Sequence, residues 1–133
     1  MSRKSKGTNA ERELIHLFWK TGRFAAVRVA GSGSIKYPVP DVYAASATKK
    51  LAIECKSLKG DAQYIKKSAV EELKIFAQLV GAQPVIAVRF DHTGWYFLPP
   101  EGLRDAGKNY VIHKEEVEFR AQTFEELSDT KTI

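Results

Sequence analysis

Apolar residues in the first part of the chain recur with the spacing of an amphipathic helix. The pattern predicts a helix that begins at Thr8 or Asn9 and ends at Gly22. Glu11 lies three residues before Leu14, so its side chain shares the packed side of this helix. It also has the spacing of a capping box with Thr8. The role of this carboxylate therefore stays open between a helix cap and a functional site.

Shorter apolar runs in the rest of the chain predict β-strands. They cover residues 23–30, 42–45, 51–56, 84–90 and 95–98, and 110–113 as a short edge strand. The runs at 42–45 and 51–53 flank a polar turn and form a predicted β-hairpin. A second helix, from Ser68 to Gly81 and with a capping box at its start, joins this hairpin to the strand at 84–90. This β-α-β connection predicts a mixed α/β domain.

The composition is that of a soluble globular protein. The 133 residues suit a single domain, 1–133, with 44% hydrophobic and 28% charged residues. No segment has the length and apolar character of a membrane span or a secretory signal, so we expect a cytoplasmic location and no membrane partner. Residues 1–7 are predicted to form a basic, flexible arm, 123–127 a short helix or a turn, and 128–133 a loose tail.

The charge balance favours a polyanionic partner. Lysine and arginine number 21 against 16 aspartates and glutamates, which gives a net charge of +5. Nucleic acid is the commonest partner of such a chain, although many basic proteins bind none. The basic residues expected to contact DNA outside the candidate site are Arg3, Lys4, Lys6, Lys59, Lys66 and Lys67. For the N-terminal residues, a purely solubilising role is an equal alternative.

Charged residues at the ends of the predicted hairpin form the strongest candidate for a site. Alternation along the strand places Glu54 and Lys56 on one face and Cys55 on the other. Pairing of the strands then brings Asp41, which follows Pro40, near Glu54. Carboxylates are the hard oxygen ligands of Mg²⁺ or Mn²⁺, and a lysine beside them can hold a water molecule or stabilise charge on a phosphate. A solvated strand end is the alternative interpretation.

Three further features are open between a structural and a functional role. Arg28 interrupts an apolar strand and needs an anionic partner, either a core carboxylate or a phosphate. The flexible segment 31–34 is either a connector or the rim of a site. The apolar residues at 84–98, which include a turn at 91–94, either fill the core or in part form a dimer face.

Four motifs occur in an order that is similar to a known family. They are Ala10–Leu14 (Ala-Glu-Arg-Glu-Leu), Val27–Ser32 (Val-Arg-Val-Ala-Gly-Ser), Pro40–Val42 (Pro-Asp-Val) and Ile53–Lys56 (Ile-Glu-Cys-Lys). In these motifs the chain resembles the archaeal Holliday junction resolvase family, within the PD-(D/E)xK nuclease superfamily. The resemblance runs from about Gly7 to Leu98. It implies a restriction-endonuclease-like α/β fold, in which helices flank a central mixed β-sheet.

The resemblance also implies roles for individual residues. Three carboxylates would bind the metal ion, Glu11, Asp41 and Glu54. Lys56 would be the catalytic lysine, and Ser32 would lie near the scissile phosphate. Arg12 and Arg28 would contact phosphate beside the site. The segment 33–39 is longer than in some relatives, which leaves the position of Ser32 open.

The family consists of homodimers that require Mg²⁺ or Mn²⁺ and nick two opposed strands of a four-way DNA junction. The resemblance therefore predicts a Mg²⁺-dependent endodeoxyribonuclease of this kind, associated with the nucleoid. A nuclease of the same fold that cuts ordinary duplex DNA is one alternative, and a non-catalytic basic nucleic-acid-binding module is another. Relatives have been linked to the replication sliding clamp, but the tail of this chain carries no convincing clamp-binding motif.

Overall fold

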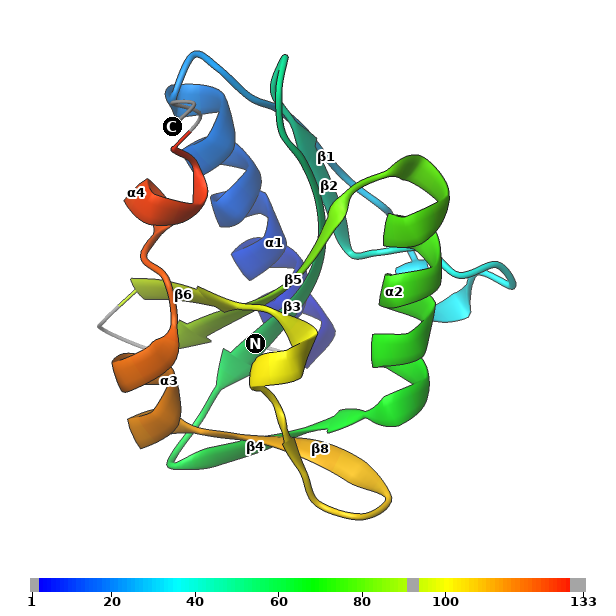
Figure 1. Cartoon of the computed structure of the whole chain (residues 1–133), viewed down its shortest axis with the longest axis vertical. Coiled ribbons are helices and arrows are strands. Elements are labelled where there is room, and N and C mark those ends of the chain that lie inside the picture. The colour runs from blue at the N-terminus through cyan, green and yellow to red at the C-terminus, as the bar shows by residue number, and fades with distance from the viewer. Residues whose placement is uncertain (1–2, 91–93, 130–133) are drawn as a thin grey trace.

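A five-stranded mixed sheet forms the centre of the molecule in the computed structural model (Figure 1). The structure describes the backbone of residues 3–90 and 94–129, and side chains from residue 7 onward within these ranges. The strands of this sheet are, in spatial order, β1 (Ala25–Arg28), β2 (Val42–Ala45), β3 (Lys50–Leu58), β5 (Gln83–Phe90) and β6 (Gly94–Leu98). Two helices cover its faces, α1 (Arg3–Lys20) and α2 (Lys67–Val80).

The hairpin and the helical crossover expected from the sequence are both present in the sheet. β2 and β3 pair as an antiparallel hairpin, with Val42 opposite Ile53. β3 and β5 run parallel, and α2 makes the crossover between them. β1 pairs with β2, and β6 with β5, both antiparallel. The predicted mixed α/β fold, with a central sheet between helices, is therefore confirmed.

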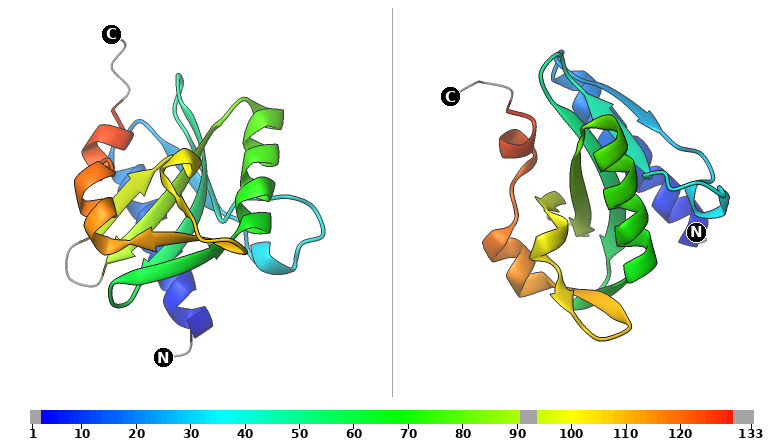
Figure 2. Two further views of the ribbon diagram at one scale, coloured as in Figure 1. Left: turned by 60° about the horizontal axis from the view of Figure 1, so that its bottom comes forward. Right: turned by 45° about the vertical axis from the view of Figure 1, so that its right-hand side comes forward.

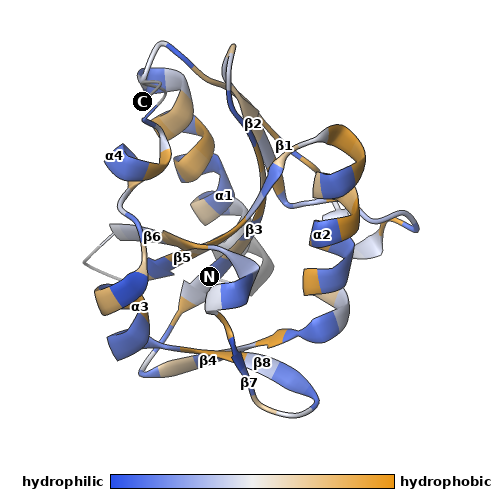
Figure 3. Ribbon diagram, viewed as in Figure 1, coloured by the Kyte–Doolittle hydropathy of each residue, from blue (hydrophilic) through white to orange (hydrophobic). Residues whose placement is uncertain are grey.

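Hydrophobic side chains pack on both faces of the central sheet. In Figure 3 the hydrophobic residues along the strands and helices are coloured orange. Leu14 and Phe18 of α1 lie in one cluster with Ile53 of β3. Val70 and Leu73 of α2 lie in the other cluster, on the opposite face. Each fully buried side chain of this size contributes about 1.5–3 kcal/mol. A slip of one residue would move the apolar side chains of β3 to the wrong faces, so the two clusters fix the register of this strand.

The first helix begins earlier than its capping motif predicts. α1 starts at Arg3, so residues 3–7 of the predicted arm are helical and Thr8 lies inside the helix. The prediction of a helix start there, with a capping box, is wrong. Arginine and lysine are good helix formers, and extending an existing helix needs no new nucleation step. The end of α1 at Lys20, before Gly22, agrees with the prediction.

The second helix also begins without the predicted cap. α2 starts at Lys67, and no side chain caps its first turn, so the capping box proposed for 68–71 is wrong. The start of α2 is set by strand pairing, because strand β4 (Ala62–Lys66) pairs with strand β8 (Asn109–His113) up to the residue before the helix. Gly81 ends the helix in the left-handed conformation, with φ 70°, as expected for a glycine at this position.

A second, three-stranded sheet is not predicted by the hydrophobic pattern. Its strands are, in spatial order, β4, β8 (Asn109–His113) and β7 (Arg104–Asp105). Figure 2 shows this sheet beside the end of α2 where that helix begins. The prediction of 110–113 as an edge strand is wrong, because β8 lies between the other two strands. β4 mixes polar and apolar residues, and its pairing with β8 decides its conformation.

Two short helices follow the second sheet, α3 (Lys114–Arg120) and α4 (Phe124–Leu127). The sequence pattern does not predict α3. The segment 123–127, predicted as a short helix or a turn, is helical. Thr123 and Glu126 form a capping box at its start, in which each side chain bonds the backbone amide of the other residue.

The predicted loose tail is in part anchored. Ser128 is buried, and its backbone carbonyl accepts a hydrogen bond from Arg23 Nη2 at 3.3 Å. The ammonium of Lys49 donates to the carbonyls of Leu127 and Asp129. The prediction is therefore wrong for the first two residues of the tail. Residues 130–133, and residues 91–93 of the predicted turn, lie outside the described part of the chain.

Candidate active site

The candidate site lies where strands β2 and β3 separate. Their ladder ends at Val42 and Ile53, with a last hydrogen bond from the backbone amide of Asp41 to the Ile53 carbonyl at 3.0 Å. The amide of Cys55 lies beyond this ladder. The carboxylate of Asp41 bonds it instead, since Oδ2 accepts a hydrogen bond from Cys55 N at 2.9 Å. The side chain of Asp41 is therefore held at the opening of the hairpin.

Asp41 and Glu54 meet at this opening. The two carboxyl groups lie close enough for the charge of Asp41 to act on Glu54. Burial and the negative charge of Asp41 raise the pKa of Glu54 to about 8, and Lys56 offsets part of the rise. Two carboxyl groups in contact cannot both ionise without strong repulsion. The proximity that the hairpin pattern predicts for these two residues is present in the structure.

Glu11 approaches the same place from α1. Its Oε1 lies 3.5 Å from Nη1 of Arg28, so the anionic partner of this arginine is a carboxylate. The pKa of Glu11 is raised, first by burial and then by the charge of Asp41, and Arg28 opposes the rise. A helix that begins at Arg3 leaves Glu11 no role as an N-terminal cap.

The loop that carries Ser32 reaches the site. Gly31 adopts the left-handed conformation, with φ 68°, and leads into a short 3₁₀ helix, Ser32–Ser34. The hydroxyl of Ser32 donates a hydrogen bond to Asp41 Oδ1 at 2.6 Å. One oxygen of Asp41 is thus held by this serine and the other by the amide of Cys55. The length of the segment 33–39 does not displace Ser32 from the carboxylates.

Lys56 and Cys55 point to opposite faces of β3, as strand alternation predicts. Lys56 shares a face with Glu54, and its positive charge acts on the pKa of that carboxyl group. Cys55 packs against the cluster beneath α1, and burial raises the pKa of its thiol well above the usual value. A thiolate is the reactive form of cysteine, so Cys55 is a core residue rather than a nucleophile.

The three carboxylates offer the ligands of a hard divalent cation, but they do not form a closed metal site. In residues 3–90 and 94–129, no group of three or more His, Cys, Asp and Glu side chains could hold a metal ion as it stands. Glu11 turns to Arg28, whereas both carboxylate oxygens of Asp41 accept hydrogen bonds from Ser32 and from the amide of Cys55. Both glutamates have raised pKa values, which reflect negative charge in a partly buried place. A divalent cation would offset that charge.

The basic residues predicted to contact DNA differ in their availability. Three of them are exposed, Arg12, Lys59 and Lys66. Lys67 Nζ lies 2.9 Å from Asp105 Oδ1 and 5.3 Å from the centre of the Tyr110 ring, so its charge is already matched within the protein. The side chains of Arg3, Lys4 and Lys6 lie outside the described part of the structure.

Glu13 is a residue beside the site that the sequence pattern does not single out. Its carboxylate accepts hydrogen bonds from Nε and Nη2 of Arg89, at 3.0 and 3.2 Å, and from Nε1 of Trp95 at 2.8 Å. The hydrogen bonds from Arg89 are the main reason why the pKa of Glu13 is lowered. These contacts tie α1, the helix that carries Glu11, to the hairpin of β5 and β6. No sequence signal could reveal them, because the partners are 76 and 82 residues away.

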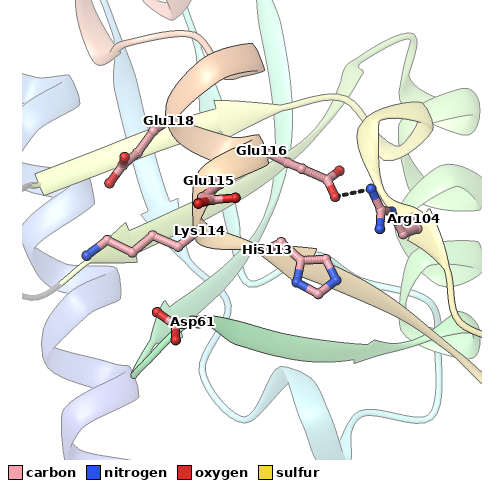
Figure 4. A pocket seen from close by; sticks show the side chains of 7 residues that line it. All are labelled: Asp61, Arg104, His113, Lys114, Glu115, Glu116 and Glu118. Carbon is pink, nitrogen blue, oxygen red and sulfur yellow. Dashed lines mark ion pairs between the residues drawn. The ribbon is translucent and has the colours of Figure 1, made fainter.

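A hollow beside α3 contains none of the predicted site residues (Figure 4). It is lined by Asp61, Arg104, His113, Lys114, Glu115, Glu116 and Glu118. Arg104 and Glu116 form an ion pair within it. Acidic side chains outnumber lysine and arginine in this lining, so the hollow disfavours a polyanion.

Comparison with known proteins gives consistent matches. A family model described as archaeal Holliday junction resolvase (Hjc) matches residues 2–132. Crossover junction endodeoxyribonuclease Hjc of Archaeoglobus fulgidus is 42% identical over 109 residues, covering 82% of this chain and 79% of that protein. The protein of the same name from Methanocaldococcus jannaschii is 37% identical, with 80% and 75% covered. Crossover junction endodeoxyribonuclease Hje of Saccharolobus solfataricus is 36% identical, with 74% and 75% covered.

The fold agrees with a solved structure of the same group. The structure of Archaeoglobus fulgidus Hjc, described as a Holliday junction resolvase from an archaeal hyperthermophile, superimposes with a TM-score of 0.82 at 36% sequence identity. The match covers 89% of this chain and 94% of that one. Sequence and backbone therefore point to one group, and the chain belongs to the archaeal Holliday junction resolvase family.

Proposed function

We propose that this chain is a structure-selective DNA endonuclease that resolves four-way (Holliday) junctions by metal-dependent hydrolysis of phosphodiester bonds. Relatives named crossover junction endodeoxyribonuclease support the class of reaction. The observation that carries the proposal is the convergence of the Asp41 and Glu54 carboxyl groups beside Lys56 at the opening of a β-hairpin. Hydrolysis of a phosphodiester builds negative charge at phosphorus, and such a site can stabilise it.

Mg²⁺ is the proposed cofactor, with Mn²⁺ as a substitute. Asp41, Glu54 and Glu11 would hold the ion, because carboxylate oxygens are the ligands that these hard cations prefer. A bound divalent cation supplies a Lewis acid and lowers the pKa of its coordinated water. It would also relieve the repulsion between carboxylates described above.

The side chains of the protein itself position these groups and the DNA. Ser32 fixes the orientation of the Asp41 carboxylate. Arg28 neutralises Glu11, and its other guanidinium donors would bind a phosphate of the DNA. Lys56 would hold a water molecule or stabilise charge on the phosphate. The exposed basic residues proposed to contact phosphates further away are Arg12, Lys59 and Lys66.

We also propose a homodimer, so that two sites nick opposed strands. Val27, Ile75 and Leu79 are 57%, 46% and 78% exposed, which is unusual for large apolar side chains. Ile75 and Leu79 are four residues apart on the outer side of α2. Val27 pairs with Tyr43, whose ring contacts Phe76 of α2, so it lies on the same face of the sheet as this helix. A second copy of the chain would cover this apolar surface.

Three variants and two substrates test the proposed function. In Asp41→Asn, Glu54→Gln and Lys56→Ala we expect cleavage of a synthetic four-way junction to fall by about 10²-fold or more, while junction binding persists. Each protein is assayed with and without Mg²⁺, beside a linear duplex of the same sequence. Equal cleavage of junction and duplex by the wild type would contradict junction selectivity. The absence of nicks in both would favour a non-catalytic binding module.

Two further predictions concern the surroundings of the protein. No helix in the described residues has the length and apolar character needed to cross a membrane. A cytoplasmic, nucleoid-associated location stays a prediction, and so does a contact with the replication sliding clamp.

A further inference from the structure

A hollow beside the catalytic lysine is not used by the proposed chemistry. It is lined by Lys56, Tyr64, Lys66, Ala69 and Asn109, and its volume is about 410 Å³. Its walls come from the end of β3, the paired strands β4 and β8, and the start of α2, where the two sheets approach each other (Figure 2). A hollow of this size can accept a small planar group such as a nucleobase.

The strand geometry places three of these side chains on one surface. Tyr64 and Lys66 are two residues apart on β4, so they share a face of the second sheet. Asn109 is directly opposite Lys66 in the pairing of β4 with β8 and lies on that same face. Ile65, between them, is buried in the core. The burial of Ile65 therefore holds Tyr64 and Lys66 toward the hollow.

The same surface offers an aromatic ring and a free positive charge. Tyr64 is 60% exposed, and its ring contacts no other ring within the described residues. Lys66 forms no ion pair within the described part of the chain, in contrast to Lys67, which is paired with Asp105. Lys56 adds a second ammonium at the end of the hollow that lies toward the carboxylates. An exposed aromatic ring that lines the same hollow as two cations is typical of surfaces that bind unstacked nucleotides.

We propose that this hollow holds the nucleotide next to the scissile phosphate, with the Tyr64 ring stacked on its base and Lys66 on the adjoining phosphate. The proposal rests on the proposed function, because it places the cleaved strand at Lys56. In a continuous duplex every base face is covered by its neighbours, so the tyrosine can stack only if a base is first displaced. At the branch point of a junction, stacking is interrupted and a base face is open. Tyr64 is therefore a specificity-determining residue for branched DNA.

Equilibrium binding in the absence of divalent cations tests this role independently of cleavage. Wild type, Tyr64→Phe, Tyr64→Leu and Tyr64→Ala are titrated with a four-way junction and with a linear duplex of the same sequence. We expect Tyr64→Ala and Tyr64→Leu to weaken junction binding by about 5- to 100-fold, the effect of one lost base stack, with duplex binding nearly unchanged. Tyr64→Phe keeps the ring and should bind the junction like the wild type. Phe119→Ala, which removes a 92% exposed ring from α3, is the matched control and should leave both affinities unchanged.

Lys66→Gln separates the charge from the ring. It should weaken binding to junction and duplex by the same factor and lower the salt dependence of both by about one charge. A 2-aminopurine base at the branch point reports stacking directly, and its fluorescence should be quenched by wild type and Tyr64→Phe but not by Tyr64→Leu.

Two results would overturn the inference. One is an unchanged ratio of junction to duplex affinity in both Tyr64→Ala and Tyr64→Leu. The other is a loss in Tyr64→Phe as large as that in Tyr64→Ala, which would assign the effect to the hydroxyl. Failure of the proposed function has a different signature, namely a wild type that binds the junction through Tyr64 but does not cut it with Mg²⁺.

Discussion

At the scale of single residues, the two central carboxyl groups of the site differ in how well their surroundings stabilise the charge. That of Asp41 is well stabilised and that of Glu54 is not. Asp41 accepts hydrogen bonds from Ser32 and from the amide of Cys55. Glu54 is partly buried beside Asp41, and burial is the main reason why its pKa is raised. Perturbed carboxyl groups of this kind are concentrated at functional sites, because the protein bears their cost only where they are needed.

Glu54→Gln should make the metal-free protein more stable at alkaline pH. The folded pKa of Glu54 is about 8 and the usual value is 4.5, so between these values the unfolded chain has lost a proton that the folded protein keeps. Stability therefore falls as the pH rises from 4.5 to 8, by an amount of the order of a few kcal/mol. Glutamine does not ionise, so the gain of the variant over the wild type should be larger at pH 8.5 than at pH 5.

Urea denaturation in EDTA at the two pH values measures this difference. Glu118→Gln, which changes an exposed glutamate on α3, serves as the control and should show no such trend. An equal stability difference between Glu54→Gln and wild type at both pH values would refute the argument. Addition of Mg²⁺ at pH 8.5 should stabilise the wild type more than Glu54→Gln if the ion binds this carboxylate.

Ser32→Ala should slow cleavage and leave junction binding intact. The variant removes the 2.6 Å hydrogen bond to Asp41 Oδ1, and a hydrogen bond to a charged group is worth about 1.5–3 kcal/mol. We expect the single-turnover rate to fall by roughly 10- to 100-fold. Ser34→Ala is the matched control, because within the described residues its hydroxyl in the same 3₁₀ helix bonds the Gly31 carbonyl and no carboxylate. Equal rates for the two variants would mean that Ser32 does not position Asp41.

At the scale of elements, the sequence predicts the strands whose own apolar side chains determine how they pack against the core. The apolar runs at 42–45 and 51–53, on either side of a polar turn, suffice to place the hairpin of β2 and β3, and with it the approach of Asp41 to Glu54. The hairpin is local, so turn and register can be read from one short stretch. The larger part of the sheet and the candidate site is predictable for this reason.

Elements set by distant partners could not be predicted in the same way. β4 becomes a strand through β8, which begins more than forty residues later in the chain, and this pairing also decides where α2 starts. Local capping motifs at Thr8 and Ser68 give way to the propensity of the preceding residues and to this pairing. For the same reason the sequence could not reveal the contacts of Glu13, since Arg89 and Trp95 are far away in the chain.

Glu13→Gln should loosen the attachment of α1 to the sheet. The variant keeps the shape of the side chain but removes the charge that accepts hydrogen bonds from Arg89 and Trp95. We expect a loss of about 1–2 kcal/mol in the free energy of unfolding. Cleavage should fall as well, because the same helix carries Glu11, whereas duplex binding should not change. Urea denaturation measures the loss of stability and junction cleavage measures the loss of activity, with Glu118→Gln as the control. An unchanged free energy of unfolding in Glu13→Gln would contradict the role of Glu13.

At the scale of the whole molecule, charge and apolar surface are distributed unevenly. The chain carries a net charge of +5, yet the hollow beside α3 is lined mainly by acidic residues. The candidate catalytic residues lie on the hairpin of β2 and β3, and Lys66 lies on the second sheet. DNA should therefore approach the molecule from this side. Phosphate binding at one site carries no information about a four-way junction. Selectivity must come from the spacing of two sites in a dimer, from the branch point itself, or from both.

Leu79→Glu tests the contribution of the dimer. A charge at this exposed position on α2 leaves the core unchanged but makes the apolar surface of Val27, Ile75 and Leu79 costly to bury against a second copy. We expect a folded monomer in sedimentation at micromolar concentration, where we expect the wild type to be a dimer. On a supercoiled plasmid with an extruded cruciform, paired nicks give a linear product, whereas the uncoupled sites of the monomer should give mainly nicked circles.

Phe119→Glu places the same charge on another exposed apolar residue and should remain dimeric with paired cleavage. If Leu79→Glu is still a dimer, the surface of Val27, Ile75 and Leu79 is not the dimer interface. If it is a monomer that still makes fully paired nicks, the spacing between two sites is not what selects the junction.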